Sequence, residues 1–421
     1  MEKDNNIEIF TKTDKTKVIN IIEKENYKDL EENELLTLAI EKLPKNYNFE
    51  IYKSIKKIRE ISKEKNKKKP LIALQFPEGL LIFSLLISDI LENFAECETI
   101  ILGDITYGAC CIDDIGCSFL DCDLIIHYAH SCLKPNKMTL IKVMYIFVEI
   151  KIDIEHLIKT IELNFPKEQN DFLYLLSSLQ YNSTLFVLKR KLIENGYDKN
   201  NINIPQIKPR VIGEIIGCTS PILEKKKENC YIIFICDGRF HMESLMIQNP
   251  NFKYFQYNPF TKYLTIEEYD IELMKKIRFE QIEKLKESKL IGVIFGTLGR
   301  QGSKGILNRI NKLLNENNKD FINICLNEIT EEKISQFKQC DCFIQIACPR
   351  LSIDWSNQFS KPMLTPYESY IAFGKIGKPD VYRMDNYSND TGEWGHLYKE
   401  KSFYLCFFYF FSIFYIFYNF E

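Results

Sequence analysis

Three cysteines lie in sequence settings where a thiol can do chemistry. Cys110 stands in "TYGACCIDD", Cys218 in "EIIGCTSPIL" and Cys348 in "IQIACPRLS". Each follows an apolar, strand-like run and has Gly, Pro or another small residue close by. We therefore expect each thiol at the carboxyl end of a parallel strand, where open α/β sheets form their ligand crevices. Thiols at such positions are candidate ligands for zinc or for an iron–sulfur cluster.

The spacing of the cysteines argues against a local metal motif. No pair has C-x-x-C spacing, and the histidines lack zinc-finger spacing, so zinc-ribbon and thioredoxin interpretations lose their support. The compact ferredoxin-type run is absent as well. Any metal centre must combine distant parts of the chain. Spacing alone leaves open that all three are packing residues, the role we expect for the cysteines in or beside apolar strands: Cys230, Cys236, Cys325 and Cys342.

Composition narrows the class of protein. The chain has 421 residues, enough for two to three domains. Its 55 Lys and Arg against 58 Asp and Glu give a net charge of −3, which disfavours nucleic acid as a partner. The first residues contain no apolar signal-peptide segment. We therefore expect a cytoplasmic, reducing setting, in which the cysteines are free thiols or metal ligands.

The C-terminal residues 402–420 carry no charge and are dominated by Phe and Tyr. As a helix they are long enough to cross most of a bilayer core. A membrane span is usually rich in Leu and Val, with aromatic residues at its ends. We therefore favour a biased terminal extension over a membrane anchor, and both interpretations stay open.

Apolar strand-like runs alternate with helical patterns, and the alternation begins three times. The expected strands are "LIALQF", "TIILGDI", "DLIIHYA" and "VMYIFVEI", then "FLYLLSS", "VIGEII", "YIIFIC" and "KYFQYN", then "LIGVIFGT", "FINICL", "CFIQIA" and "KPMLTPYE". This pattern predicts an α/β fold of three similar domains with mostly parallel sheets flanked by helices. The expected segments are a disordered extension (1–30), a helical lead-in and charged linker (31–69), the three domains (70–165, 166–285 and 286–395), and the aromatic tail (396–421).

The stretch "GTLGRQGS" places Gly296, Gly299 and Gly302 between a strand and a helix. Backbone N–H groups of such a loop can hold a carboxylate or a phosphate. Gln301 and Gly302 occupy the Gly-Lys positions of a nucleoside-triphosphate loop, so that class is not supported. A tight turn that needs positive φ explains the glycines equally well.

Other polar side chains follow apolar strands at the same expected sheet edges: His127 and His130 in "HYAHS", and Asp237, Arg239 and His241 in "CDGRFH". They either line the crevice or are structural polar groups.

Arg350 and Asp354 follow Cys348. They either position a substrate carboxylate or pair with each other.

Seven blocks, in order, closely resemble the diphthamide-synthesis radical enzyme family, 2-(3-amino-3-carboxypropyl)histidine synthase. They are "LQFPEGLL", "GDITYGACCIDD", "HYAHSCL", "GEIIGCTSP", "DGRFHMESLMIQNP", "GTLGRQGS" and "ACPRLSIDW". Within that family they are closer to the eukaryotic subunit 1 than to subunit 2. The resemblance runs from about Glu32 to "YSNDTGEWG" at 387–395 and leaves out the N-terminal residues and the aromatic tail.

The resemblance implies a 4Fe-4S cluster bound by one cysteine from each of three domains that meet around a central site. The matching positions are Cys110, Cys218 and Cys348. Cys111 competes with its neighbour, and we favour Cys110 because the family keeps a cysteine directly after Tyr-Gly-Ala. Three thiolates leave one iron open. The family uses that iron to bind S-adenosylmethionine.

The resemblance also implies the reaction and the partners. The reduced cluster splits the bond from sulfur to the γ-carbon of S-adenosylmethionine, giving a 3-amino-3-carboxypropyl radical rather than the 5′-deoxyadenosyl radical of the usual radical enzymes. This fragment joins a histidine imidazole carbon of translation elongation factor 2, the first step of diphthamide formation. The implied partners are a related second subunit in a heterodimer and a small iron-protein electron donor. The resemblance does not identify catalytic residues beyond the cluster.

The candidate residues for binding S-adenosylmethionine share a place beside the expected crevice: Gly299, Arg300, Gln301, Gly302, Asp237, Arg239, His241 and Arg350. Two other functions remain open. One is a non-catalytic scaffold that stabilises a related cluster-bearing partner. The other is a generic α/β small-molecule transferase that uses the glycine loop.

Overall fold

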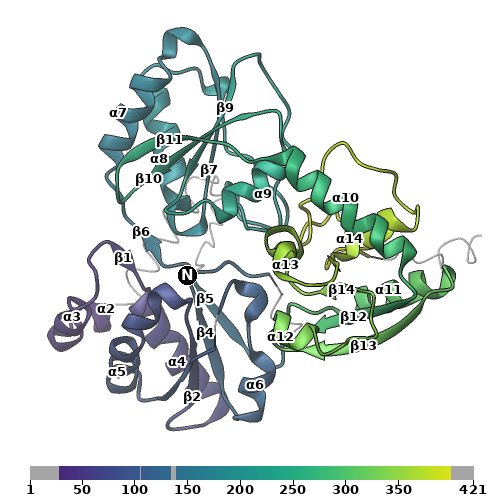
Figure 1. Ribbon diagram of the computed structural model, residues 1–421. Helices are drawn as coiled ribbons and strands as arrows, with labels where there is room; N and C mark the ends of the chain where they lie inside the picture. Colours follow the sequence, from purple (N-terminus) through teal and green to yellow (C-terminus); the bar gives the residue numbers. More distant parts are fainter. Residues whose placement is uncertain (1–27, 105, 134–138, 400–421) are drawn as a thin grey trace, which may run out of the picture.

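The computed structural model describes residues 28–104, 106–133 and 139–399. These residues form three lobes that follow one another along the chain, each built on one mostly parallel sheet with helices on both faces (Figure 1). The α/β fold expected from the sequence is therefore confirmed. A small antiparallel pair, β1 (Tyr47–Asn48) with β6 (Glu149–Ile150), accompanies the three sheets.

Lobe 1 contains the parallel sheet β3-β2-β4-β5. Its strands are β2 (Leu71–Gln75), β3 (Glu98–Leu102), β4 (Leu124–Tyr128) and β5 (Val143–Ile146). Its helices are α2 (Lys28–Glu31), α3 (Glu34–Ile40), α4 (Ile51–Lys65), α5 (Ser84–Ala95) and α6 (Asp114–Phe119). Successive strand residues face opposite sides of a sheet. Ile72 and Leu74 accordingly join the core under α4 and α5, whereas Ala73 joins the core under α6.

Lobe 2 contains the sheet β11-β10-β9-β7-β8, in which only the edge strand β11 is antiparallel to its neighbour. Its strands are β7 (Phe172–Ser177), β8 (Ile202–Asn203), β9 (Cys230–Ile235), β10 (Lys253–Asn258) and β11 (Tyr263–Glu267). The helices α7 (Ile154–Asn164) and α8 (Asn182–Glu194) pack on one face, and α9 (Phe240–Gln248) packs on the other.

Lobe 3 contains the parallel sheet β13-β12-β14-β15. Its strands are β12 (Leu290–Gly296), β13 (Asp320–Leu326), β14 (Cys342–Ile346) and β15 (Met363–Leu364). The helices are α10 (Ile271–Glu287), α11 (Lys304–Glu316), α12 (Glu331–Ile334), α13 (Pro349–Trp355) and α14 (Pro366–Ala372). Short 3-10 helices lie between these elements: η1 (Glu78–Phe83), η2 (Ala109–Cys111), η4 (Lys167–Gln169), η5 (Leu179–Tyr181), η6 (Lys199–Asn201) and η7 (Ser356–Gln358).

The three sheets share one strand order. In each, the first strand lies between the second and the third, and the fourth lies beyond the third: β3-β2-β4-β5, β8-β7-β9-β10 and β13-β12-β14-β15. The three-fold repeat seen in the sequence thus has a counterpart in topology. The residue boundaries expected between the three domains remain a prediction.

Two expectations about strands are wrong. The run "VIGEII" at 211–216 forms only isolated bridges, Ser177 with Glu214 and Ile216 with Thr219. Its backbone turns locally, since the Glu214 carboxylate accepts from the Val211 amide. The second strand of lobe 2 is instead the short β8, and β11 is an additional strand that the sequence pattern did not indicate.

The N-terminal segments also differ from expectation. The structure begins with α2 and buries Leu30, so order starts before residue 31; residues 1–27 lie outside the described residues. Helix α4 continues into the expected charged linker. There Lys65 and Lys67 both bind the buried carboxylate of Asp123.

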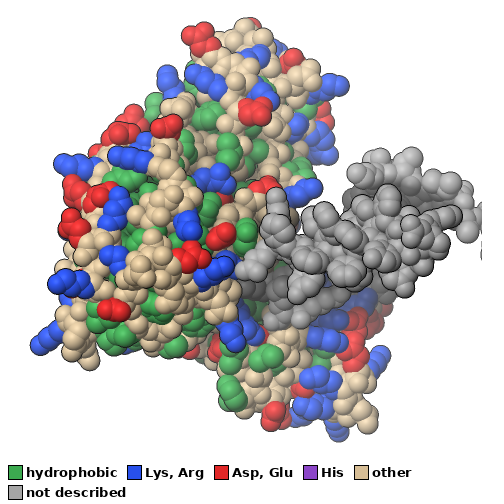
Figure 2. All heavy atoms as spheres, turned by 90° about the vertical axis from the view of Figure 1, so that its right-hand side faces the viewer, with side chains coloured by type: hydrophobic (Ala, Val, Ile, Leu, Met, Phe, Trp, Pro, Cys, Tyr) green, Lys and Arg blue, Asp and Glu red, His purple; other side chains and the backbone are tan. Residues whose placement is uncertain are grey.

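No helix in the described ranges is long and apolar enough to span a membrane. The aromatic segment 402–420 lies outside those ranges, so its interpretation stays a prediction. Figure 2 shows one face of the molecule, where acidic and basic side chains are interspersed without a large area of one sign. On this face, that pattern agrees with the small net charge of the chain.

We predict that Gly292→Ala in β12 lowers the free energy of unfolding by about 1–3 kcal/mol, the usual cost of overpacking a core. A Cβ at this position would overlap the Phe343 ring on the neighbouring strand. Gly79→Ala is the matched control, because a Cβ there meets nothing within 4 Å. Urea unfolding of both variants checks this; equal stabilities would contradict the described packing of Phe343.

Candidate thiol centre between the three lobes

The three cysteines singled out by the sequence come from three different lobes. Cys110 lies in η2, beyond the end of β3. Cys218 lies in the loop before β9, between the bridged residues Ile216 and Thr219. Cys348 is the N-cap of α13, shortly after β14, and Pro349 starts that helix. Cys110 and Cys348 therefore lie beyond the carboxyl ends of β3 and β14, as predicted. Cys218 instead follows a run that forms only isolated bridges, one of them with Ser177 at the end of β7.

Exposure separates these thiols from the others in the described part of the chain. Cys110, Cys218 and Cys348 are half-buried, whereas every other described cysteine is either buried or fully exposed. A half-buried thiol is shielded from bulk water yet remains accessible to a ligand. The sequence could not show this difference, because exposure depends on how distant loops pack together.

The three thiols are electrostatic neighbours. Cys110 interacts with both Cys218 and Cys348, and Cys348 interacts with Cys218. Cys110 and Cys218 also pack against one small apolar cluster that contains Tyr387. Burial raises the pKa of the Tyr387 hydroxyl, and the neighbouring thiols of all three cysteines and of Cys111 raise it further. The chain therefore gathers one thiol from each lobe around Tyr387.

Burial dominates the protonation of these thiols. It raises the pKa of Cys348 to about 12, with a further contribution from the neighbouring Cys218. Burial also raises the pKa of Cys218, although a hydrogen bond with Thr219 and the nearby cations Arg210 and Arg350 oppose the rise. Without a metal these thiols are protonated at neutral pH. Binding a metal would release the protons.

Cys110 and Cys111 differ in a way that bears on which of them binds metal. Their sulfurs are 3.9 Å apart, and Cys111 is only 1% exposed. Hydrogen bonds, first from the Cys110 thiol, lower the pKa of Cys111 to about 7, whereas the pKa of Cys110 is raised. Acidity thus favours Cys111 and accessibility favours Cys110. A bound metal deprotonates its thiol ligand outright, so the raised pKa of Cys110 does not exclude it as a ligand.

The glycine loop of lobe 3 packs directly on this cysteine pair. Gly299 has φ +52°, and a Cβ there would overlap the backbone of Cys111. The Arg300 amide donates to the Cys110 carbonyl at 2.8 Å. The Gln301 side-chain amide lies 3.3 Å from the Cys111 sulfur and 3.8 Å from the Cys110 sulfur. A turn that needs positive φ is therefore present, and the loop contacts the Cys110 segment.

The charged side chains expected to bind S-adenosylmethionine have protein partners. The Arg300 guanidinium makes a bidentate pair with the buried Asp114 carboxylate, at 2.7 and 2.6 Å. Arg350 is 3% exposed and pairs with Asp354 at 2.8 Å, so of the two alternatives left open the structure shows the pairing. Arg350 also bonds Glu243 at 2.5 Å.

The candidates in "CDGRFH" separate in space. Asp237 is exposed and interacts with Tyr181, and Arg239 forms exposed ion pairs with Glu243 and Glu267. Asp237 interacts electrostatically with the buried Cys236 rather than with the three candidate thiols. The remaining candidate, His241, instead faces lobe 1.

His241 belongs to a group of three histidines at the junction of lobes 1 and 2. His127 bonds Gln75 at 2.9 Å through one ring nitrogen and His130 at 2.9 Å through the other. His130 and His241 interact electrostatically. Gln75 in turn donates to the Cys111 carbonyl at 2.9 Å, so the histidines are linked to the cysteine segment through backbone.

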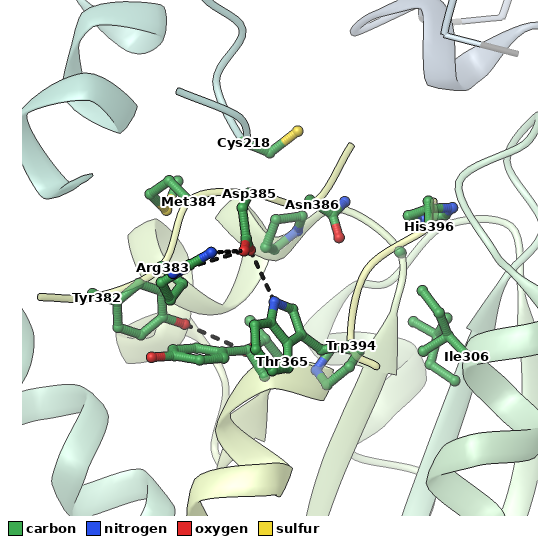
Figure 3. Close-up of a pocket in the computed structure, with 15 residues that line it drawn as sticks. Cys218, Ile306, Thr365, Tyr382, Arg383, Met384, Asp385, Asn386, Trp394 and His396 are labelled. Atoms are coloured by element: carbon green, nitrogen blue, oxygen red, sulfur yellow. Dashed lines mark hydrogen bonds and ion pairs between the residues drawn. The ribbon is translucent and has the colours of Figure 1, made fainter. Parts of the chain in front are cut away.

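A small pocket lies beside Cys218, with an enclosed volume of about 20 Å³ (Figure 3). Its walls come from the loops that follow β14 and β15 and from the C-terminal stretch 382–396. Asp385 accepts hydrogen bonds from Arg383 and from the Trp394 indole. Cys218 lies above Asp385 and Asn386 at one end of the pocket.

Sequence reasoning missed several residues around the thiols. Tyr387 and Asn386 lie in "DNYSNDTGEWG", which was noted only as the end of the resemblance. His396, assigned to the tail, stacks on Tyr387 with ring centroids 4.4 Å apart. The sequence around Arg210 and Asp114 did not indicate a role for them, because it does not distinguish them from charged residues on the surface.

The thiols of Cys110, Cys218 and Cys348 are the donors available to an iron–sulfur cluster. No three His, Cys, Asp or Glu side chains in the described ranges surround a single metal ion. A 4Fe-4S cluster spreads its thiolates over a wider span than one ion does, because each binds a different iron. A set made only of thiols suits iron–sulfur chemistry and is unsuited to Mg²⁺ or Ca²⁺. The three half-buried thiols therefore fit such a cluster.

Fold and site together define a three-lobed α/β protein with one half-buried thiol from each lobe at its centre. Residues 76–383 match the family model described as putative diphthamide synthesis protein. The chain belongs to this diphthamide synthesis family.

Relatives carry a more specific name. The Schizosaccharomyces pombe protein named 2-(3-amino-3-carboxypropyl)histidine synthase subunit 1 is 46% identical over 370 residues, which cover 87% of this chain and 83% of the relative. The protein of the same name from Saccharomyces cerevisiae is 45% identical over 361 residues, covering 85% and 83%. The Dictyostelium discoideum protein of that name is 45% identical, covering 85% and 75%.

Solved structures support the fold. Dph2 from Pyrococcus horikoshii superposes with a TM-score of 0.65 at 25% identity, covering 80% of this chain and 92% of that one. A second structure of the same protein, described as containing a 4Fe-4S cluster, gives a TM-score of 0.64 at 24% identity. It covers 82% of this chain and 95% of that one.

We predict that stability falls as the pH drops from 6.5 toward 4. Burial lowers the pKa of His130 and of His241 to about 4, from an ordinary value of 6.5. Below pH 6.5 the unfolded chain therefore binds more protons than the folded chain, and each histidine costs up to about 3 kcal/mol by pH 4. The stability that these neutral histidines provide is fully present above pH 6.5.

The measurement is urea unfolding across this pH range for the native chain and for His241→Asn, which cannot be protonated there. Carboxyl groups titrate in both proteins and cancel in the difference. An equally steep loss of stability in the two proteins would contradict the prediction.

Proposed function

We propose that this chain is a catalytic, cluster-bearing subunit of a 2-(3-amino-3-carboxypropyl)histidine synthase. In this role it transfers the 3-amino-3-carboxypropyl group of S-adenosylmethionine to a histidine imidazole carbon of translation elongation factor 2. The observation that carries the proposal is the set of three half-buried thiols, one from each lobe, that neighbour one another around Tyr387. A scaffold that only supported a partner would have no need for this arrangement.

In this proposal Cys110, Cys218 and Cys348 each bind one iron of a 4Fe-4S cluster, and the fourth iron stays open to S-adenosylmethionine. The cluster described in the Pyrococcus Dph2 structure supports this assignment. When bound and reduced, the cluster supplies the electron that splits the bond between sulfur and the γ-carbon. The protein holds the thiols and shields them from bulk water.

Atoms and electrons balance over the whole proposed reaction. The sulfonium loses its aminocarboxypropyl group and leaves as 5′-methylthioadenosine, while the imidazole carbon exchanges its hydrogen for that group. The hydrogen leaves the imidazole as a proton. The electron left behind balances the electron that was used to cleave the sulfur–carbon bond. A small iron protein is the proposed first electron donor, and catalysis needs no net reductant.

We propose that bound S-adenosylmethionine borders the pocket beside Cys218, whose enclosed volume of about 20 Å³ admits little more than a water molecule. Arg300 and Arg350 are occupied by carboxylates, and the glycine loop packs on the Cys110 segment. The pocket by contrast adjoins a candidate iron ligand and has an aromatic wall that includes Trp394. An aromatic wall suits stacking of an adenine ring.

The proposed partner is a related second subunit, since the relatives are named as subunit 1 of their synthase. The decisive experiment combines this chain, purified anaerobically, with that subunit, elongation factor 2 and reductant. S-adenosylmethionine carries its label on the aminocarboxypropyl carbons. We expect label on the protein substrate and 5′-methylthioadenosine in solution. Formation of 5′-deoxyadenosine, or no cleavage by a cluster-loaded heterodimer, would overturn the proposal and favour the scaffold.

We predict opposite outcomes for two adjacent substitutions. Cys110→Ser removes a half-buried ligand and should abolish the broad visible absorption and the iron content of about four per chain. Cys111→Ser changes a buried thiol and should leave iron content within about a factor of two, because the three ligands remain. Iron analysis after anaerobic reconstitution checks both. The reverse result would make Cys111 the ligand.

A further inference from the structure

Three arginine side chains each connect two different lobes beside the thiols. They are Arg210 of lobe 2 and Arg300 and Arg350 of lobe 3. Arg210 and Arg350 are almost completely buried, 2% and 3% exposed. A guanidinium in such a place is costly unless carboxylates or carbonyls satisfy it, so the groups that each arginine binds are informative.

Arg300 joins lobe 3 to lobe 1. Its bidentate partner Asp114 is fully buried at the start of α6, and the second carboxylate oxygen of Asp114 also accepts from the Leu140 amide at 2.7 Å. The backbone amide of Arg300 also donates to the Cys110 carbonyl. Arg300 therefore fixes the segment that carries the lobe 1 thiol against the glycine loop.

Arg350 joins lobe 3 to lobe 2. It lies on α13, which begins next to Cys348. Its guanidinium donates to the carbonyls of Gly217 at 3.2 Å and Phe240 at 2.7 Å, and it lies over the Phe240 ring at 4.2 Å. Gly217 directly precedes Cys218, so this one side chain spans the segments of two of the three thiols.

Arg210 joins lobe 2 to lobe 1. Its guanidinium donates to the Ser131 hydroxyl at 3.0 Å and to the Cys132 carbonyl at 2.6 Å. Ser131 also donates to the Glu214 carboxylate of lobe 2 at 2.5 Å. Arg210 lies close enough to Cys218 to act on its thiol electrostatically. This contact holds the Cys218 loop against the loop that follows β4.

The three contacts close a triangle: lobe 1 to lobe 2, lobe 2 to lobe 3 and lobe 3 to lobe 1. We propose that Arg210, Arg300 and Arg350 are positioning residues that hold the three cysteine-bearing segments together before any cluster is present. The proposal rests on the function proposed above for the thiols, and the contacts themselves involve only protein groups. None of the three arginines needs to touch a substrate in this role.

A purely structural role is the alternative, and the chain contains a matched example of it. Arg278 is as deeply buried and pairs bidentately with Glu368 at 2.6 Å. Its other partners, the carbonyls of Ser352 and Met363, also belong to lobe 3. Losing Arg278 should destabilise the fold without changing how the three thiol segments sit against each other.

The test uses the iron-free full-length chain with Arg210→Lys, Arg300→Lys or Arg350→Lys, and with Arg278→Lys as the control. Lysine keeps the charge but cannot make several directed hydrogen bonds at once. Hydrogen exchange is followed in the segments 107–112, 130–133, 215–220 and 346–351, and anaerobic iron uptake is measured on the same samples. Urea unfolding of each variant reports global stability.

We expect roughly tenfold faster exchange in the two segments that each substituted arginine joins, and slower iron uptake, beyond any change that global stability explains. Arg278→Lys should change these segments only in proportion to its loss of global stability. Unchanged local exchange in all three variants, or the Arg278→Lys pattern in all of them, would overturn the inference.

If Arg210→Lys or Arg350→Lys fails to fold, the half-exposed Arg300→Lys and its partner variant Asp114→Asn decide the question. Faster exchange at 107–112 in both supports the inference, and native exchange in both refutes it. A native chain that binds no iron would refute the proposed function, while the exchange pattern would still decide the role of the arginines.

Discussion

The geometry of the molecule depends on one constraint: three separate sheets must present loops from their carboxyl ends to a common centre. Parallel sheets with both faces covered leave those ends as the natural place for a site. A single lobe supplies only one half-buried thiol, so no lobe can make the centre alone. The energy that holds the lobes together is therefore also the energy that assembles the site.

The contacts between the lobes beside the thiols include buried charged side chains. The core of each lobe consists of apolar side chains, whereas the contacts beside the thiols also include buried guanidinium, carboxylate and carbonyl groups. Directed hydrogen bonds fix distance and angle more tightly than apolar packing does. Such contacts suit a centre whose ligands must be held apart at a set spacing.

Much of the fold could be predicted from the sequence, because the strands of parallel sheets are continuous apolar runs that alternate with helical patterns along the chain. "LIALQF" and "LIGVIFGT" became β2 and β12 with small changes at their ends. "VIGEII" misled, since its β-branched residues pack in a turn that a carboxylate stabilises. The two-residue β8 was too short to leave any pattern.

The site was less readable. The three cysteines stood out through their Gly and Pro neighbours, but their different exposure arises only when distant loops pack together. Arg350 pairs with Asp354, as one of the two sequence interpretations had it, but the other carboxylate partner of Arg350, Glu243, and the partner of Arg300, Asp114, lie more than a hundred residues away. Local sequence carries no information about such pairings.

A centre with one thiol from each lobe also has a consequence for synthesis. Lobes fold in order as the chain leaves the ribosome, the N-terminal one first. Cys348 belongs to the last lobe, so a nascent chain that already carries Cys110 and Cys218 still lacks Cys348 until 130 further residues have been added. Any metal loading is therefore confined to the released or nearly completed polypeptide, and a truncated product cannot acquire the centre.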